Sequence, residues 1–160
     1  MHGMMMDRPL KIIDILKFAE EVHPTQEIIS RTLQNTIHTT NYGEIGQRAR
    51  KMSKALLSMG IKLGDRVATL AWNGYRHFEL YFAISGIGAI CHTINPRLFK
   101  DQLAYIINHA NDKILFCDLS IVPILKDVMA DINKVQSIII MTNKQNMSQI
   151  ELENAICYEE

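Results

Sequence analysis

The sequence of 160 residues has no excess of charge, because 17 lysine and arginine residues are balanced by 17 aspartate and glutamate residues. Binding to nucleic acid or to anionic lipid relies on a basic surplus, so this balance argues against both kinds of partner. The sequence also lacks an apolar run of about 18 residues, the length that a membrane-spanning helix requires. Its first residues lack the charged segment and apolar core of a signal peptide. We therefore expect neither a transmembrane segment nor secretion.

Cysteine is scarce, and the three cysteines, Cys91, Cys117 and Cys157, lie far apart without a CxxC pair. An odd number of widely spaced cysteines predicts neither a disulfide framework nor a zinc site. Reduced thiols are typical of cytoplasmic proteins, so we expect a cytoplasmic location and assign no metal ligands.

Glycine is missing where a dinucleotide-binding loop would need it. Gly86 and Gly88 form a GxG pair, but no third glycine follows at the required spacing. The pair also follows a predicted helix, whereas the dinucleotide-binding motif follows a strand. Dinucleotide binding is therefore excluded.

The residues that are present suffice for a folded core. Hydrophobic residues make up 48% of the chain and charged residues 21%, which are ordinary values for a globular protein. The length fits one domain or one subdomain of a larger protein. We treat residues 1–160 as one partial domain, with residues 1–10 as a loose lead-in.

The central stretch of the chain is residues 66–99. Residues 67–72 form a nearly continuous apolar run, typical of a strand buried on both faces of a parallel sheet. Asn73-Gly74 is then a strand-to-helix turn, because a helical pattern follows it. Residues 89–94 are predicted to be a second buried, central strand, so that the stretch forms one βαβ unit.

The flanking segments continue the alternation of strands and helices. A capping residue, Asn41, with Glu44 three residues later, opens an apolar helical stripe that Gly60 ends. We predict a hairpin of residues 27–31 and 36–40 around a two-residue turn, Gln34-Asn35. Further helices are predicted from residue 12 to before Pro24 and at residues 103–110, 122–132 and 150–156, and strands at 113–117 and 137–141. The predicted fold class is α/β, a mostly parallel sheet of βαβ units with flanking helices and an N-terminal β-hairpin.

The basic residues beside the helical stripe allow two interpretations: an anion-binding patch or a solvated helix face. We favour the solvated face, because carboxylates elsewhere balance the charge. The residues concerned are Arg48, Arg50, Lys51 and Lys54.

The strongest local candidate for function is Asn95-Pro96-Arg97, which leaves the second strand at the edge where open α/β sheets bind ligands. Arg97 offers a planar fork for phosphate or carboxylate, unless it only pairs with Asp101. Trp72 and Asn73 leave the first strand at the same edge. They either face a cleft or serve as a core residue and a turn residue.

Two histidine pairs are weak candidates for catalysis. Cys91 and His92 are neighbours on a strand, so their side chains face opposite sides and do not form a nucleophile–base pair. His77 and Glu79 point in different directions on a helix. No catalytic residue is therefore assigned.

Taken together, these residues resemble a specific family. The resemblance is carried by the segment TLAWNGYRHFELYFAISGIGAICHTINPRLFKDQLAYIINHANDKILF, which is similar to the N-terminal region of AMP-forming acyl-CoA synthetases. Within it, the pattern WNxxxHxExYxAxxGxGAxxHTxNPRL resembles the medium- and long-chain fatty-acid branch of the adenylate-forming superfamily. The similarity runs from about residue 5 to the end of the chain.

The resemblance implies a two-step ligase reaction. A fatty acid attacks the α-phosphate of ATP, with Mg²⁺ assisting, to give an acyl-adenylate and pyrophosphate, and the thiol of coenzyme A then displaces AMP. It places Asn95, Pro96 and Arg97 on the coenzyme A side. It places Trp72, Asn73 and His77 along the acyl side of the cleft. In the full enzyme this sheet would pack against more of the N-terminal domain, so we expect the isolated chain to expose an apolar face and to self-associate, for example as a homodimer.

One departure from the family is large: the Ser/Thr/Gly-rich phosphate loop ending in Pro-Lys-Gly is absent. We therefore expect an N-terminal fragment or a truncated copy that neither catalyses adenylation alone nor binds ATP, Mg²⁺ or coenzyme A tightly. The alternative is a non-enzymatic module that binds an acyl ligand or a partner subunit. A downstream reading frame encoding the phosphate loop would favour the ligase, and a stop codon after Glu160 would favour the module.

Overall fold

The computed structural model describes residues 3–4, 6–33, 35–148, 150, 152 and 154–160. Its strands are β1 (Glu27–Arg31), β2 (Ile37–Asn41), β3 (Arg66–Leu70), β4 (Ile90–Ile94), β5 (Ile114–Asp118), β6 (Ser137–Met141) and β7 (Ile156–Cys157). Its helices are α1 (Ile12–Val22), α2 (Tyr42–Ser58), α3 (Tyr75–Gly86), α4 (Lys100–Ala110), α5 (Val122–Val128) and α6 (Lys144–Met147), with 3₁₀ turns at Leu119–Ile121 and Met129–Asp131. None of the helices in the described part of the chain is long and apolar enough to cross a membrane.

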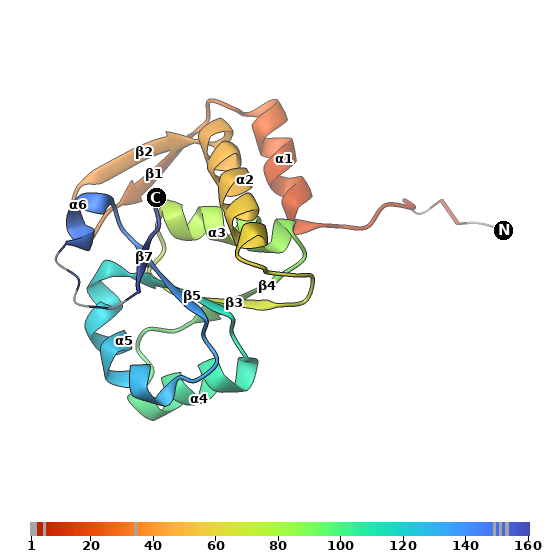
Figure 1. Cartoon of the computed structure of the whole chain (residues 1–160). Coiled ribbons are helices and arrows are strands. Elements are labelled where there is room, and N and C mark those ends of the chain that lie inside the picture. The colour runs from red at the N-terminus through yellow and green to blue at the C-terminus, as the bar shows by residue number, and fades with distance from the viewer. Residues whose placement is uncertain (1–2, 5, 34, 149, 151, 153) are drawn as a thin grey trace.

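Five strands form one parallel sheet in the order β4-β3-β5-β6-β7, and β1 and β2 form a separate antiparallel pair (Figure 1). The predicted βαβ unit is confirmed, because β3 and β4 pair in parallel with α3 as their crossover. The predicted α/β class with a mostly parallel sheet and an N-terminal hairpin is confirmed as well.

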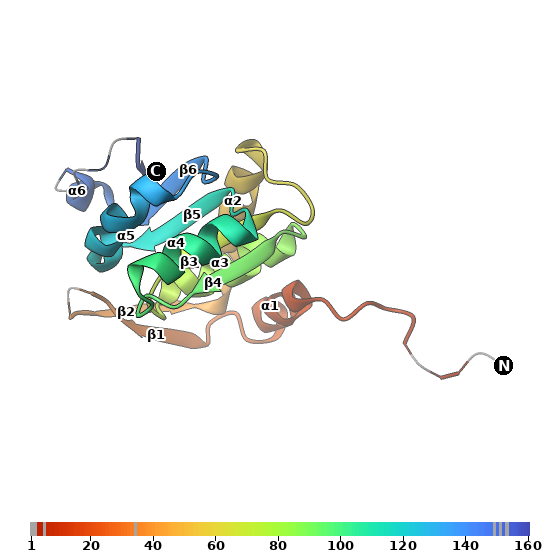
Figure 2. The same cartoon turned by 90° about the horizontal axis from the view of Figure 1, so that it is seen from below.

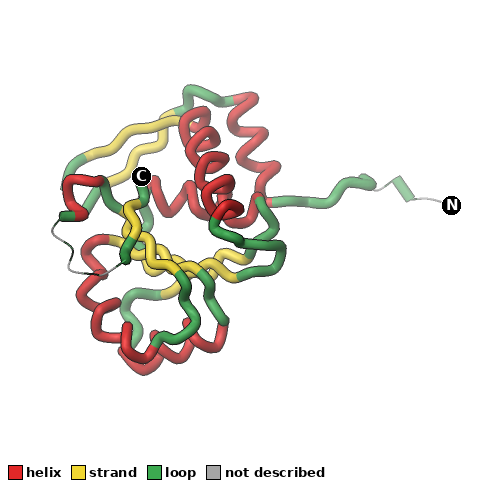
Figure 3. Tube along the Cα trace, viewed as in Figure 1, coloured by secondary structure: helices red, strands yellow, loops and turns green. Residues whose placement is uncertain are grey.

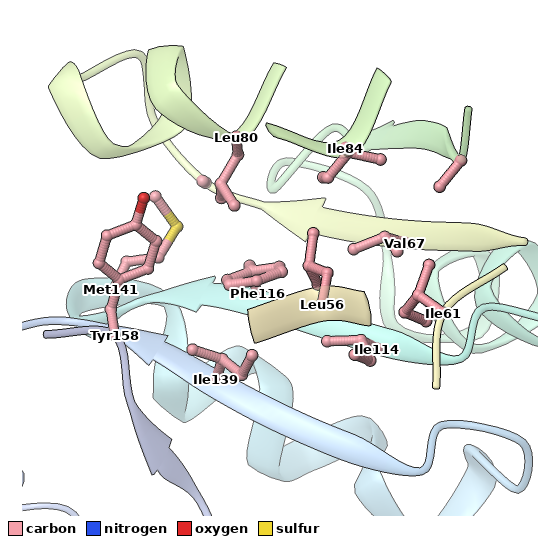
Figure 4. Close-up of a cluster of buried hydrophobic side chains, with 12 residues drawn as sticks. Leu56, Ile61, Val67, Leu80, Ile84, Ile114, Phe116, Ile139, Met141 and Tyr158 are labelled. Atoms are coloured by element: carbon pink, nitrogen blue, oxygen red, sulfur yellow. The ribbon is translucent and has the colours of Figure 1, made fainter. Parts of the chain in front are cut away.

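Helices cover both faces of the sheet, and the tube in Figure 3 shows them on either side of the strands. On one face, Leu56 of α2 and Leu80 and Ile84 of α3 pack on Val67 and Phe116 of the sheet (Figure 4). On the other face, α4 and α5 pack on the alternate residues of the same strands, and Figure 2 shows these helices lying across the sheet. Strands buried on both sides explain the continuous apolar runs in the sequence.

The residues predicted to begin and end the helix α2 do so in the structure. The Asn41 side chain accepts a hydrogen bond of 2.9 Å from the backbone N–H of Glu44 at the start of α2. Gly60 follows the end of α2 with φ +85°, the left-handed conformation that glycine adopts without strain. The Glu44 carboxylate does not complete the capping box, because it accepts from the hydroxyl of Thr40 at 2.7 Å.

Two expectations were wrong in part. The strand predicted to be central, β4, lies at one edge of the described sheet, and Ile90 is 51% exposed. The hairpin turn is longer than two residues, because the N–H of Thr32 already bonds the carbonyl of Thr36. Gln34 of that turn lies outside the described residues.

The prediction of a helix at residues 150–156 is also wrong. The described residues of this segment form no helix, and Ile156 pairs with Ile139 as part of β7. The short helix α6 lies instead in the polar segment before it, where the Asn143 side chain accepts from the N–H of Asn146 at 3.1 Å. The remaining residues of the predicted helix, 151 and 153, lie outside the described residues.

Candidate functional site

The candidate site lies at the carboxyl edge of the sheet. Leu70 of β3 is in register with Ile94 of β4 on one side and with Cys117 of β5 on the other. Because the strands are parallel, the loops that follow them lie next to each other. The structure therefore brings the loop at Trp72 and Asn73 beside the loop at Asn95–Arg97.

A small pocket opens at this edge, with a volume of about 60 Å³. Three of the predicted site residues, Trp72, Asn73 and His77, line it together. The ends of β5 and β6 and the tip of the β1–β2 hairpin complete its wall, through Asp118, Met141, Arg31 and neighbouring residues. Asn95, Pro96 and Arg97 lie outside this lining.

Two hydrogen bonds attach Trp72 to the end of β5 and to the turn that follows β5. Its backbone N–H donates to Asp118 Oδ2 at 2.6 Å, and its indole Nε1–H donates to Ser120 Oγ at 3.2 Å. The side chain is still 40% exposed. Trp72 is thus neither a pure core residue nor free in solvent.

The Asn95-Pro96-Arg97 loop is shaped by its own side chains. Asn95 Oδ1 accepts from the backbone N–H of Arg97 at 3.0 Å, which closes the turn. The Arg97 guanidinium lies over the indole of Trp72, with its central carbon 5.7 Å from the ring centroid. Among the described residues it forms no ion pair with Asp101, so the pairing considered as an alternative is not what holds this arginine.

His77 lines the pocket and is buried, with 4% of its surface exposed. Its Nε2 lies 3.0 Å from the hydroxyl of Thr69, and its ring stacks on Tyr81 with centroids 4.7 Å apart. Burial lowers the pKa of His77, and a contact with the backbone of Trp72 offsets only part of this effect. The imidazole is therefore neutral at pH 7 and can support the site without carrying charge.

Two residues of the site were missed from the sequence. Asp118, at the end of β5, is 8% exposed, and its pKa is raised by burial although the Trp72 amide and Arg76 oppose the shift. Arg76, at the start of α3, reaches toward the carbonyl of Met141 at 3.4 Å. A carboxylate directly after a predicted parallel strand could have indicated Asp118, because it ends at the same edge as Trp72.

Carboxylates bind the two arginines of α2, Arg48 and Arg50. Arg48 donates through Nε to Glu79 Oε1 at 2.6 Å and through both terminal nitrogens to Glu159 at 3.0 Å. Arg50 pairs with Glu20 at 2.7 Å. The solvated-face interpretation is therefore wrong for Arg48, which is half-buried, whereas Lys51 and Lys54 are exposed as it predicts.

The structure also separates Cys91 from His92. His92 Nδ1 pairs with Asp112 Oδ2 at 2.8 Å. Burial raises the pKa of the Cys91 thiol to about 11, so the thiol is protonated at neutral pH and is a poor nucleophile. This agrees with the exclusion of a Cys–His pair.

Comparison of the sequence with known proteins identifies its relatives. The chain is 43% identical over 152 residues to 3-methylmercaptopropionyl-CoA ligase of Ruegeria lacuscaerulensis, a match covering 94% of this chain and 28% of the relative. It is 38% identical over 160 residues to the medium-chain-fatty-acid–CoA ligase of Ectopseudomonas oleovorans, covering 100% of this chain and 29% of the relative. The chain thus spans less than a third of the length of these curated relatives.

The fold agrees with this relationship. A fatty acyl CoA synthetase of Mycobacterium tuberculosis superimposes with a TM-score of 0.73 at 21% identity, over 87% of this chain and 27% of that chain. The family model described as AMP-binding enzyme matches residues 17–157, which include both loops of the candidate site. The chain therefore belongs to the family of AMP-binding enzymes.

Proposed function

We propose that the chain forms the N-terminal part of an AMP-forming fatty-acid–CoA ligase. In that reaction a fatty acid attacks the α-phosphate of ATP to give an acyl-adenylate and pyrophosphate, and the thiol of coenzyme A then displaces AMP. The observation that carries the proposal is the similarity to two curated CoA ligases along almost the whole chain. The position of the site at the carboxyl edge of the sheet supports it.

The residues of this chain would supply one wall of the binding site. A pocket of about 60 Å³ is far below the 300–1,000 Å³ typical of small-molecule sites. We assign Asn95, Pro96 and Arg97 to the coenzyme A side, and Trp72, Asn73 and His77 to the acyl side. The neutral, buried imidazole of His77 suits an apolar acyl ligand better than a charged one.

No residue of this chain is assigned to the metal ion or to the triphosphate. Mg²⁺ would neutralise phosphate charge during adenylation, but in the described part of the chain no group of three or more His, Cys, Asp or Glu side chains could hold a metal ion. The contribution of this chain to catalysis is therefore to bind and orient substrate.

The proposal is tested by ATP–pyrophosphate exchange with a panel of medium- and long-chain fatty acids and 3-methylmercaptopropionate. The 160-residue chain is compared with a chimera in which it replaces the matching segment of the Ectopseudomonas oleovorans ligase. We expect exchange in the chimera alone. Exchange by the 160-residue chain would overturn this account of where ATP binds, and silence of a folded chimera would favour a non-enzymatic partner-binding module.

We also propose that the isolated chain self-associates, with a homodimer as the simplest form. The outer side of α1 exposes four large apolar side chains, at 51–66% of their surface: Ile12, Ile15, Phe18 and Val22. Contiguous apolar surface of several hundred Å² usually marks an interaction site. Light scattering and binding of a hydrophobic dye test this, and a dye-negative monomer would refute it.

A further inference from the structure

Trp72 occupies the middle of three loops at the carboxyl edge. Its strand, β3, lies between β4 and β5, and all three strands run in parallel. The indole N–H reaches Ser120 in the loop after β5, and the face of the indole reaches Arg97 in the loop after β4. One side chain therefore connects both neighbouring loops.

The contact with Arg97 leaves the guanidinium available to a ligand. In the described part of the chain, no carboxylate forms an ion pair with Arg97, which is exposed and contacts the indole face. Its N–H groups lie in the plane of the guanidinium, and that plane can pack on a ring while the edge still donates hydrogen bonds. A phosphate is a bidentate acceptor of matching shape.

The two attachments at Asp118 and Ser120 restrict where the indole can go. The backbone of Trp72 is fixed by a short hydrogen bond to a buried carboxylate, and the ring is fixed by its own N–H. An arginine has many rotamers in solvent, and a fixed aromatic surface reduces the entropy lost when it binds an anion. The stabilisation by such a surface is largest for an arginine that has no ion-pair partner.

We propose that Trp72 is a positioning residue for Arg97, and that the pair presents the guanidinium to a phosphate group of a nucleotide-type ligand. This inference rests on the proposed function, in which that ligand is the phosphate-bearing end of coenzyme A. It gives Trp72 a role beyond the acyl wall, because the residue lines the pocket and its indole also contacts the arginine.

The first test needs no ligand. Trp72 is the only tryptophan of the chain, so the intrinsic fluorescence reports on this contact. We expect Arg97→Leu to increase quenching of Trp72 by acrylamide and to shift its emission, with Arg97→Lys intermediate because an ammonium packs less well on a ring. The matched control is Lys100→Leu, which removes a nearby exposed charge that pairs with Asp131. Unchanged emission in the Arg97→Leu variant would overturn the proposal.

The second test measures binding of adenosine bisphosphate, the nucleotide end of coenzyme A, by calorimetry at millimolar concentration. We expect Trp72→Leu to weaken binding about fivefold, the size of an exposed cation–π contact, and Trp72→Phe to restore most of it. Arg97→Leu should abolish binding, and Lys100→Leu should leave it intact. The affinity for decanoate should be the same in the Lys100→Leu variant as in the unmodified chain.

The outcomes separate this inference from the proposed function. Equal affinity of the Trp72→Leu and Trp72→Phe variants, or no binding by the unmodified chain, would overturn the inference even if the chimera exchanges pyrophosphate. A response of Trp72 to decanoate alone would place the side chain on the acyl side only. Failure of the chimera, with the bisphosphate results as expected, would leave a phosphate-binding module and overturn the ligase.

Discussion

Two carboxylates, Glu79 on α3 and Asp112 in the loop between α4 and β5, are both completely buried, yet their surroundings differ. Glu79 accepts from Arg48 at 2.6 Å through one oxygen and from the hydroxyl of Tyr158 at 2.7 Å through the other. Asp112 pairs with His92 through Oδ2, whereas its Oδ1 has no hydrogen-bond partner among the described residues. A buried charge is tolerated when it is fully paired and is costly when it is not.

Of the two carboxylates, Glu79 is the one whose network joins segments that are distant in sequence. Arg48 and Arg76 both bind Glu159, so the network around Glu79 ties the last described residues to α2 and α3. Burial lowers the pKa of Arg48, but the hydrogen bonds and charges of Glu79 and Glu159 more than offset this and raise it. Burial, reinforced by Glu79, raises the pKa of Tyr158 well above its ordinary value, so its hydroxyl stays a donor.

The largest effect is expected from Glu79→Ala. The substitution leaves a half-buried guanidinium and a buried hydroxyl without their shared acceptor, and it should lower the free energy of unfolding by about 3 kcal/mol or more. Urea unfolding followed by circular dichroism measures the change. The matched control is Glu160→Ala, which removes an exposed partner of Lys144 and should leave the free energy of unfolding nearly unchanged. Equal costs for the two variants would show that the network contributes no more than a surface pair.

A smaller effect is expected from Tyr158→Phe, which removes one donor to Glu79 and keeps the ring. The ring packs on Phe116 with centroids 6.0 Å apart, so the apolar contact of Figure 4 is preserved. We expect a loss of about 1.5–3 kcal/mol in the free energy of unfolding, the usual contribution of a hydrogen bond to a charged group. In a Glu79→Ala background the same substitution should cost much less, and equal costs in both backgrounds would contradict a direct hydrogen bond.

The order of strands and helices could be predicted from the sequence because its signals are local. Apolar runs mark β3, β5 and β6, and capping residues such as Asn41 mark the start of a helix. The edge position of β4 could not be predicted, because an apolar run does not say which strands lie beside it. The strand at Ile156 could not be predicted either, because its partner, Ile139, is distant in sequence.

The candidate site was predicted in its position but not in its contacts. Asn95, Arg97 and Trp72 could be placed at one edge from strand direction alone. The packing of Arg97 on Trp72 depends on side-chain directions in two loops, which no periodicity encodes. The partners of Arg48 lie 31 and 111 residues away, so the sequence offered no local reason to pair them.

The smallest effect, and the sharpest contrast, is expected from Asp112→Asn. Burial raises the pKa of Asp112, although His92 and Arg66 oppose the shift, so the folded chain binds this proton more tightly than the unfolded chain. The unmodified protein should therefore gain stability relative to the variant as the pH falls from neutral toward the ordinary aspartate pKa of about 3.9. At pH 7 the substitution should change the free energy of unfolding by less than about 1 kcal/mol, because it removes an incompletely paired charge.

The isosteric Glu79→Gln, which weakens a charge-assisted bond to Arg48, should cost about 2 kcal/mol. Urea unfolding at several pH values between about 4.5 and about 8 compares the two variants. A pH-independent difference between Asp112→Asn and the unmodified chain would mean that His92 compensates the buried charge as fully as Arg48 and Tyr158 do at Glu79.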